Sequence, residues 1–370
     1  MEKVLFSASI DEHLLGFHIP YIKWFSQHDY EVHTASKGNK DIPFVNIKHN
    51  ISFERSPFKI ANIRAFLELK KLIDENEYKL IHCHTPMASI ITRFAAMKAR
   101  KKGTKVIYTA HGFHFFKGAP LVNWVFYYSI EKIASRYTDC LITINEEDYN
   151  LAKNKLFAKN IRFVNGVGID LDIFKYQTIE KKAELRKNYR YDERDFILIY
   201  AGELSYRKHQ DLLIDAINNA QNSILNIKLL LAGAGNLYDQ YKEQIIKLGL
   251  EDKVILLGSR ADVAELMMLS DIAVSASRQE GLPVNVMEAI AIGLPLIVTD
   301  CRGNRDLVKN NENGYVIGVN DTKDFSDAIV RLHDSLQERL EFSKKNKEII
   351  QKYSLEKIVE DMCEIYQEFL

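Results

Sequence analysis

Residues 272–300, IAVSASRQEGLPVNVMEAIAIGLPLIVTD, decide the fold, because they read as a strand, a helix and a second strand. IAVSAS and LIVTD are short apolar runs of strand length. Between them, Pro283 favours the start of a helix, Gly293 favours its end, and Pro295 prevents it from continuing. A strand, a helix and a strand in this order form the repeating unit of a parallel sheet.

The same alternation runs outward from this segment through the whole chain. In the second half the other predicted strands are FILIYAGE, IKLLLAG, KVILLG and GYVIG, and in the first half they are VLFSAS, EVHTAS, LIHCH, KVIYTAH and CLITIN. The rhythm breaks at residues 166–178, where two glycines and a run of Asp and aromatic residues interrupt it. At 370 residues the chain is long enough for two domains of ordinary size. We therefore predict two Rossmann-like, doubly wound α/β domains, residues 1–168 and 169–354, facing a central cleft.

The composition and the N-terminal sequence indicate which class of protein this is. Hydrophobic residues make up 46% and charged residues 27%, which is typical of a folded globular enzyme. The four cysteines form no CxxC pair, which indicates a reducing compartment. The N-terminal MEKVLFSASIDEHLL has too short an apolar run for a signal peptide or a spanning helix, so we expect a cytoplasmic protein.

Charge is distributed unevenly between the two halves. Residues 1–168 hold 24 Lys and Arg against 16 Asp and Glu, so this half carries +8 and the remainder carries −8. Chance imbalance explains this as readily as contact of the first domain with anionic lipid or an anionic acceptor. The basic residues are dispersed and form no nucleic-acid-binding motif, so we expect no nucleic-acid partner.

Two carboxylates flank the predicted helix of the opening segment, with Glu280 before it and Glu288 on its first turns. A helix start offers unpaired backbone N–H groups to a phosphate, and carboxylates beside it accept hydrogen bonds from sugar hydroxyls. This combination suits a nucleotide-sugar. Taken alone, the pair is explained equally well as a helix cap and a solvated helix residue.

The surrounding segments favour the first interpretation. EGLPVNVME, residues 280–288, resembles the ExxxxxxxE signature of retaining family 4 glycosyltransferases of the GT-B fold. The sequence is similar to that family in four further segments, in family order: YTAHGFHF, VNGVGID, LLAGAGN and LGSRADVAEL. FHIPYIKWFSQHDYEVH and AGELSYRKHQDLL resemble bacterial enzymes that build capsule, exopolysaccharide, O-antigen or other glycans on a lipid carrier.

The resemblance implies a retaining transfer of sugar from a nucleotide-sugar, usually UDP-linked, to a lipid-linked or polysaccharide acceptor. It also implies that the last segment, residues 355–370, returns to the first domain as a helix. The residues it assigns to the donor or the reaction are Gly16, His111, Arg207, Lys208, Arg260, Glu280, Leu282, Val284 and Glu288.

The resemblance implies that these residues contact different parts of the donor. Glu280 takes the sugar hydroxyls and Glu288 the ribose, while Arg207 and Lys208 neutralise the departing diphosphate, which is where charge develops in the transition state. Backbone groups around Arg260 are expected to contact the base.

The remaining assignments concern phosphate and sugar contacts. Leu282 and Val284 have backbone N–H groups for phosphate, whereas Pro283 has none. His111, at the carboxyl end of a predicted strand, is expected to contact the donor sugar near the reaction centre. Gly16 stands where the family has a pair of glycines.

The sequence departs from the family pattern in two places. The family's frequent GR dipeptide reads Gly202-Glu203, so one phosphate arginine is missing and Glu203 is not assigned to phosphate. The N-terminal glycine pair is reduced to the single Gly16 within HLLGFH.

No metal or other cofactor is predicted. His84 and His114 belong to the pairs HCH and HGFH, which suggest metal ligands but lack a completing set of carboxylates or thiolates. Asp170-Leu171-Asp172 resembles a DxD metal motif but follows the linker, so we interpret it as a turn. GAGNLY has Tyr238 where a dinucleotide fingerprint requires a small residue.

The stretch FHFFKGAPLVNWVFYYSIEKIASRY is unusually aromatic. Helical spacing makes it mainly core, but aromatic side chains also suit a membrane interface or a lipid-linked acceptor. The aromatic candidates for such a surface are Phe113, Phe115, Phe116, Trp124 and Tyr128, and the basic ones are Lys98, Arg100, Lys101, Lys102 and Lys105.

Two other functions fit a fold of this kind. A non-hydrolysing nucleotide-sugar epimerase shares the fold and donor, but the sequence has no evident extra pair of catalytic carboxylates. A non-catalytic nucleotide-sugar-binding subunit is disfavoured because Glu280, Glu288 and Lys208 are all present.

Overall fold

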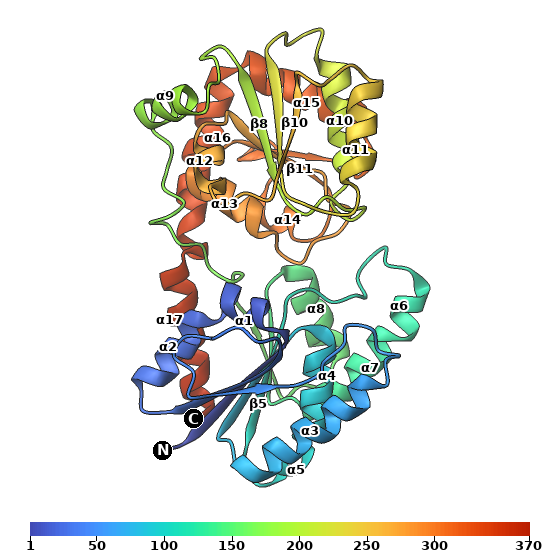
Figure 1. Ribbon diagram of the computed structural model, residues 1–370, viewed down its shortest axis with the longest axis vertical. Coiled ribbons are helices and arrows are strands. Elements are labelled where there is room, and N and C mark those ends of the chain that lie inside the picture. Colours follow the sequence, from blue (N-terminus) through green and yellow to red (C-terminus); the bar gives the residue numbers. More distant parts are fainter. The chain divides into compact units, whose positions relative to one another are not determined.

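The structure is a computed structural model that describes all 370 residues. It divides into two compact units (Figure 1). Unit 1 comprises Met1–Val167 together with Glu356–Leu370, and unit 2 comprises Gly168–Leu355. The C-terminal segment thus belongs to unit 1, and the main boundary lies one residue before the predicted one.

Unit 1 is built on a seven-stranded parallel sheet with strand order β3-β2-β1-β4-β5-β6-β7. Its strands are β1 (Lys3–Ile10), β2 (Glu31–Lys37), β3 (Ile47–Asn50), β4 (Leu80–His84), β5 (Lys105–Ala110), β6 (Cys140–Thr143) and β7 (Asn160–Phe163). Its helices are α1 (Asp11–Phe17), α2 (Ile19–Gln27), α3 (Ala61–Asn76), α4 (Pro86–Ala95), α5 (Met97–Lys101), α6 (Leu121–Val125), α7 (Tyr127–Ala134), the 3-10 turn Ser135–Tyr137, α8 (Glu146–Lys155) and α17 (Leu355–Phe369).

Successive residues of β1 face opposite layers, as the two-residue period of a strand requires. Val4 and Phe6 pack with α1, α2 and α17, whereas Leu5 packs with α3 and α4. Helix α17 contributes Tyr366, whose hydroxyl lies 2.8 Å from Nδ1 of His82 on β4. The C-terminal helix is therefore part of the core of unit 1.

Unit 2 has a six-stranded parallel sheet with strand order β10-β9-β8-β11-β12-β13. Its strands are β8 (Phe196–Ala201), β9 (Ile227–Ala232), β10 (Val254–Gly258), β11 (Ile272–Ser275), β12 (Leu296–Thr299) and β13 (Gly314–Ile317). Its helices are α9 (Ile179–Asn188), α10 (Gln210–Ala220), α11 (Tyr238–Lys247), α12 (Val263–Met268), α13 (Val284–Ile292), α14 (Asn304–Leu307), α15 (Thr322–Asp334), α16 (Leu336–Ile349) and the 3-10 turn Ile350–Tyr353.

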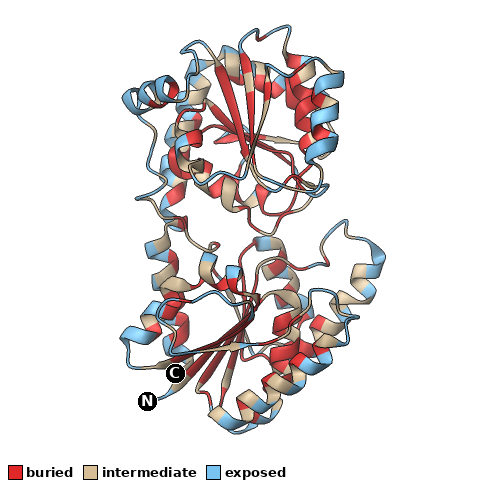
Figure 2. Ribbon diagram, in the orientation of Figure 1, coloured by how far each residue is buried: buried red, intermediate tan, exposed pale blue.

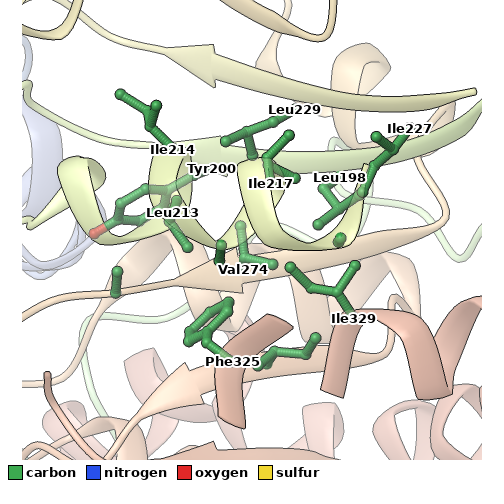
Figure 3. Close-up of a cluster of buried hydrophobic side chains, with 14 of the residues drawn as sticks. Leu198, Tyr200, Leu213, Ile214, Ile217, Ile227, Leu229, Val274, Phe325 and Ile329 are labelled. Carbon is green, nitrogen blue, oxygen red and sulfur yellow. The ribbon is translucent and has the colours of Figure 1, made fainter. Parts of the chain in front are cut away.

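The core of unit 2 explains its continuous apolar strands. Leu198, Leu229 and Val274 on neighbouring strands meet Ile217 of α10 and Phe325 of α15 in one buried cluster (Figure 3). Other helices cover the opposite face, so the sheet is buried on both sides, as Figure 2 shows. Strands buried on both faces read as near-continuous hydrophobic runs, which is why FILIYA and IKLLLA were recognisable in the sequence.

The predicted fold class, two doubly wound parallel-sheet units, is confirmed. All eleven predicted strands form, but the prediction omitted β3 and β7, which are the two edge strands of unit 1. Both are four residues long and contain no buried residue, with the sequences IKHN and NIRF. Edge strands pair on one side only, so they carry a weaker apolar signal than central strands.

Two local interpretations are settled by the structure. Asp170-Leu171-Asp172 is a turn, as predicted, because Oδ1 of Asp170 accepts a hydrogen bond of 2.9 Å from the backbone N–H of Asp172. The membrane-facing candidates Phe113 and Phe115 were wrong, since both are buried and stack on each other with ring centroids 4.8 Å apart. None of the helices combines the length and apolarity that spanning a membrane requires.

Candidate active site

The candidate site of unit 2 starts in the loop that follows β8. The backbone at the end of this strand packs tightly against the turn after β9. A Cβ atom on Gly233 would lie 1.9 Å from the carbonyl oxygen of Gly202, and one on Gly235 would lie 2.1 Å from that of Leu204. Only glycine allows this approach, and it fixes the loop that carries Arg207 and Lys208 into α10.

Arg207 and Lys208 both contact Glu280, which belongs to the loop between β11 and α13. Nζ of Lys208 donates to Oε1 of Glu280 at 2.6 Å, and a guanidinium nitrogen of Arg207 donates to Oε2 at 2.9 Å. Oε1 also accepts a 2.7 Å hydrogen bond from the hydroxyl of Ser277. The loops after β8 and β11, neighbouring strands in the sheet, thus bring three predicted site residues together at the carboxyl edge.

The charge of this cluster is well defined. The side chains of Glu280 and Lys208 are only 7% and 10% exposed, whereas that of Arg207 is 45% exposed. Burial raises the pKa of Glu280, but the charges of Lys208 and Arg207 and the hydrogen bonds from Lys208 and Ser277 outweigh it, so the pKa lies below its ordinary value. Glu280 is therefore an anion held by two cations, one buried and one open to solvent.

Three side chains that the sequence did not single out support this cluster. Tyr200 bonds Ser277 at 2.7 Å, and Nε of Arg302 donates to the backbone carbonyl of Glu280 at 3.0 Å. Arg302 itself is buried in the loop after β12. Its position two residues after a predicted strand was the signal available in the sequence, since residues at the carboxyl ends of parallel strands converge.

Helix α13 begins one residue later than the sequence suggested. Pro283 is the N-cap, with φ of −74° and ψ of 119°, and Val284 is the first helical residue. The N–H groups of Val286 and Met287 both bond the carbonyl of Pro283 at 3.2 Å, so the N–H of Val284 stays outside the helical ladder. Leu282 and Val284 follow Glu280 by two and four residues at the start of this helix, and the first N–H groups of a helix suit an anion.

Glu288 lies on the second turn of α13 and is half-buried. Burial raises the pKa of its carboxyl group to about 7, although the charge of nearby Lys208 acts in the opposite direction. The pKa values of two glutamates on one short segment thus shift in opposite directions, because Glu280 has ion-pair partners and Glu288 has none of its own. A strongly shifted carboxyl group close to a second charged cluster is typical of a functional site.

Arg260 follows β10 and is exposed. Its guanidinium group is paired with Asp262, with 2.7 Å between Nε and Oδ1. Asp262 also accepts a hydrogen bond of 2.6 Å from Tyr189. The side chain of Arg260 is therefore engaged by its own loop, and what this position offers a ligand is its backbone.

The other two predicted residues belong to unit 1. His111 directly follows β5 and lies at the carboxyl edge, with its Nε2 atom buried and without a hydrogen bond. Gly16 lies inside α1, where an added Cβ would meet nothing within 4 Å. Neither close packing nor a positive φ therefore demands glycine at this position. Glu203, the residue in place of the family's arginine, has an exposed side chain.

Comparisons with known proteins identify the family of the chain. The family model for group 1 glycosyl transferases matches residues 181–349, and the model for 4-like glycosyl transferases matches residues 3–145. A putative glycosyltransferase of Bacillus subtilis, EpsD, is 40% identical over 370 residues, covering 100% of this chain and 97% of its own. The chain therefore belongs to the glycosyltransferase family that these two models and EpsD represent, and it is a transferase.

More distant relatives extend the comparison. An Escherichia coli UDP-Gal:α-D-GlcNAc-diphosphoundecaprenol α-1,3-galactosyltransferase is 28% identical over 313 residues, covering 83% of this chain and 80% of its own. The crystal structure of Anabaena Alr3699/HepE in complex with UDP-glucose covers 100% of both chains with a TM-score of 0.81 and 19% identity. The last similarity establishes the GT-B fold.

Proposed function

We propose that this glycosyltransferase moves a sugar, with retention of its anomeric configuration, from a UDP-sugar to a hydroxyl group of a lipid-linked glycan in bacterial surface polysaccharide synthesis. The observation that carries the proposal is the convergence of Arg207 and Lys208 on Glu280 beside the start of α13. The HepE complex contains UDP-glucose, and the name of the E. coli relative specifies a UDP-sugar and a diphosphoundecaprenol acceptor.

Donor binding exchanges ion pairs within this cluster. A diphosphate has more negative charge than the carboxylate of Glu280, so Arg207 and Lys208 turn their N–H groups toward it while the N–H groups of Leu282 and Val284 add backbone donors. Glu280 is then released to accept hydrogen bonds from the sugar hydroxyls. Glu288 meets the ribose, and the backbone around Arg260 meets the base.

The transfer breaks the bond between the sugar C1 and the β-phosphate oxygen while the acceptor oxygen bonds C1 on the same face. The acceptor proton passes to the departing diphosphate, so UDP and the new glycoside are the products. Fixed cations stabilise the negative charge that develops on the diphosphate. Because Arg207 and Lys208 supply that charge, the proposal requires no metal at the diphosphate, and turnover is expected to be unchanged when Mg²⁺ is omitted.

The test is a product analysis with defined donors and acceptors. Purified protein is incubated with UDP-glucose, UDP-galactose, UDP-N-acetylglucosamine, UDP-N-acetylgalactosamine or GDP-mannose, with and without an undecaprenyl-diphosphate-linked sugar. We expect acceptor-dependent release of UDP and an α-linked product by NMR. A β-linked product refutes retention, and conversion of the donor sugar without acceptor supports an epimerase instead.

We further propose that unit 1 contacts the cytoplasmic face of the membrane through an apolar patch formed by exposed side chains of two segments. The patch consists of Phe58, Ile60, Ile63, Leu67, Leu121, Val122 and Val125, each at least 59% exposed. The rings of Phe58 and Phe126 join the two segments, with centroids 5.5 Å apart. Exposed apolar side chains gathered in this way favour a lipid or partner surface.

The basic residues suggested by the sequence lie elsewhere. Lys98 is 3.9 Å from Asp74 near the end of α3, whereas the patch surrounds the start of that helix. Arg100 is held by two hydrogen bonds to Asp139. We therefore expect Leu121→Asp with Val125→Asp to abolish flotation with anionic phospholipid vesicles, whereas Leu225→Asp, an equally exposed leucine of unit 2, leaves it unchanged.

A further inference from the structure

The loop between β8 and α10, residues 203–209, carries Arg207 and Lys208, and we call it the cation loop. Every backbone carbonyl of residues 203–208 accepts a hydrogen bond. For most of these carbonyls the donor lies in the cation loop itself, in β8, in α10, or in the turn and helix after β9. The carbonyls of Tyr206 and Arg207 are different, because Arg278, in the loop after β11, serves both of them.

Arg278 contacts the cation loop through its main chain and through its side chain. Its backbone N–H donates to the carbonyl of Arg207 at 2.8 Å, and its Nη1 donates to the carbonyl of Tyr206 at 2.7 Å. The guanidinium group also lies over the ring of Tyr206, with 4.1 Å between Cζ and the ring centroid. A planar guanidinium group can stack on a ring and donate in its own plane at the same time, whereas the ammonium group of lysine cannot.

The same guanidinium group reaches the first turn of α10. Its Nη2 lies 3.8 Å from Oδ2 of Asp211, and Oδ1 of Asp211 lies 2.9 Å from Nδ1 of His209. Burial raises the pKa of Asp211, but the hydrogen bond with His209 and the charges of His209 and Arg278 outweigh it, so the pKa lies below its ordinary value. Arg278 and Asp211 thus hold the chain on both sides of Lys208.

His209 shows that the cation loop has an unusual shape. It directly follows Lys208 and has a left-handed φ of 57°, which is uncommon for a residue other than glycine. Such a conformation persists where the surrounding contacts impose it. The contacts of Asp211 with His209 and with Arg278 are of this kind.

The loop after β11 therefore meets the cation loop in two ways. The carboxylate of Glu280 takes the side chains of Arg207 and Lys208, whereas Arg278, two residues earlier, takes the backbone that carries them. The first contact has to open when a diphosphate replaces Glu280. The second does not, so the backbone stays in place while the two cationic side chains turn.

We propose that Arg278 is a positioning residue of the donor site, which fixes the backbone of residues 206–209 so that Arg207 and Lys208 present their cations to the diphosphate. The inference rests on the proposed function, because it takes these two cations as the diphosphate ligands. Cations on a fixed backbone lose less freedom on binding and stabilise developing charge without reorganisation. Arg278 acts through the cation loop and does not itself have to touch the donor.

The alternative is that Arg278 only stabilises the fold. Its side chain is 22% exposed and Tyr206 is 73% exposed, so both lie outside the buried core of unit 2. Truncation of Arg278 should therefore leave a folded protein. The two roles differ in what such a protein shows, because only a positioning residue changes the affinity for a diphosphate.

Hydrogen–deuterium exchange of the protein without ligand tests whether Arg278 holds the cation loop. Arg278→Met keeps an apolar stem but removes the donors and the charge, and peptides covering residues 203–210 should exchange about tenfold faster than in the wild type. Arg331→Met is the matched control, because Arg331 also lies over a tyrosine ring, at 5.0 Å, and pairs with a carboxylate, at 2.7 Å. It should leave these peptides unchanged. Equal exchange in Arg278→Met and wild type overturns the proposal.

Calorimetric titration with UDP tests whether the fixed backbone serves the diphosphate. Arg278→Met should weaken binding by about tenfold, and Arg331→Met should not change it. In a protein that already carries Arg207→Ala and Lys208→Ala, Arg278→Met should add little, because the groups through which it acts are gone. Unchanged affinity in Arg278→Met, or an equally large effect in the absence of both cations, overturns the proposal.

Arg278→Lys covers the case in which Arg278→Met does not fold. Lysine keeps the charge but not the planar group, so exchange and affinity should both lie between those of Arg278→Met and wild type. Wild-type values for both would show that the guanidinium group is not needed and would also overturn the proposal. A wild-type protein that fails to bind UDP refutes the proposed function, whereas full retention of UDP binding by the variants refutes this inference alone.

Discussion

Replacement of Glu288 by glutamine tests whether the surroundings of the carboxyl group on α13 disfavour its ionised form. Burial raises its pKa from 4.5 to about 7. Between these two values the folded state binds more protons than the unfolded state, so this group's contribution to stability is fully present below pH 4.5 and is lost as the pH rises through 7. Glutamine keeps the size of the side chain but does not titrate.

The magnitude follows from the shift. A difference of about 2.5 pKa units makes the ionised carboxylate cost about 3 kcal/mol of unfolding free energy at pH 8, against about 0.8 kcal/mol at pH 5. Relative to the wild type, Glu288→Gln should therefore gain about 2.5 kcal/mol between pH 5 and pH 8. For a unit of this size that corresponds to roughly 5–10 °C in Tm.

The assay is differential scanning calorimetry of both proteins at pH 5, 6, 7 and 8, following the transition of unit 2. Glu243→Gln, an exposed glutamate on α11, serves as the control and should show a difference from wild type that does not vary with pH. A Glu288→Gln difference that is equally flat would falsify the shifted pKa. The same variant is expected to bind the nucleotide more weakly, because an NH2 donor replaces one of the two carboxylate oxygens that can accept hydrogen bonds from the ribose hydroxyls.

Three further substitutions probe the site. Lys208→Ala should lower kcat and kcat/KM together by about 10²–10³, as expected for a cation that acts in the transition state. Lys242→Ala on α11 is the control and should leave both constants unchanged. Both constants are measured from steady-state rates of UDP release. Arg302→Ala removes a buried charged donor to the backbone of Glu280 and should lower stability by about 2 kcal/mol, measured by urea unfolding; no loss would mean that this bond is not needed. Gly233→Ala places a methyl group against the carbonyl of Gly202 and should lower both Tm and soluble yield. Unchanged values would show that the loop can move to accommodate the methyl group without loss of stability.

Much of the fold was predictable because it rests on local patterns. Central strands buried on both faces have continuous apolar sequences, and Pro283, Gly293 and Pro295 mark the limits of α13. Gly293 has the left-handed φ of 86° expected at the end of a helix. The edge strands β3 and β7 were not predicted because a strand that pairs on one side only does not need a continuous run of apolar side chains.

The site was predictable in part. The spacing of Glu280 and Glu288, together with the basic pair after β8, identified residues that the structure brings to one edge of one sheet. Arg302 was missed because its place shortly after a predicted strand was its only signal, and its contact with a backbone carbonyl leaves no pattern of spacing.

The sequence by itself determined the class of protein, the parallel strands and the residue types available for a diphosphate and a sugar, because these depend on periodicity and on short motifs. Only the tertiary structure decided which charges are paired. It made Glu280 an anion between two cations, raised the pKa of Glu288 to about 7, and brought the rings of His13 and His18 to those of His84 and His111. The physical reason is that burial and distance set the protonation of side chains and their pairing, and both arise only when segments far apart in the chain meet.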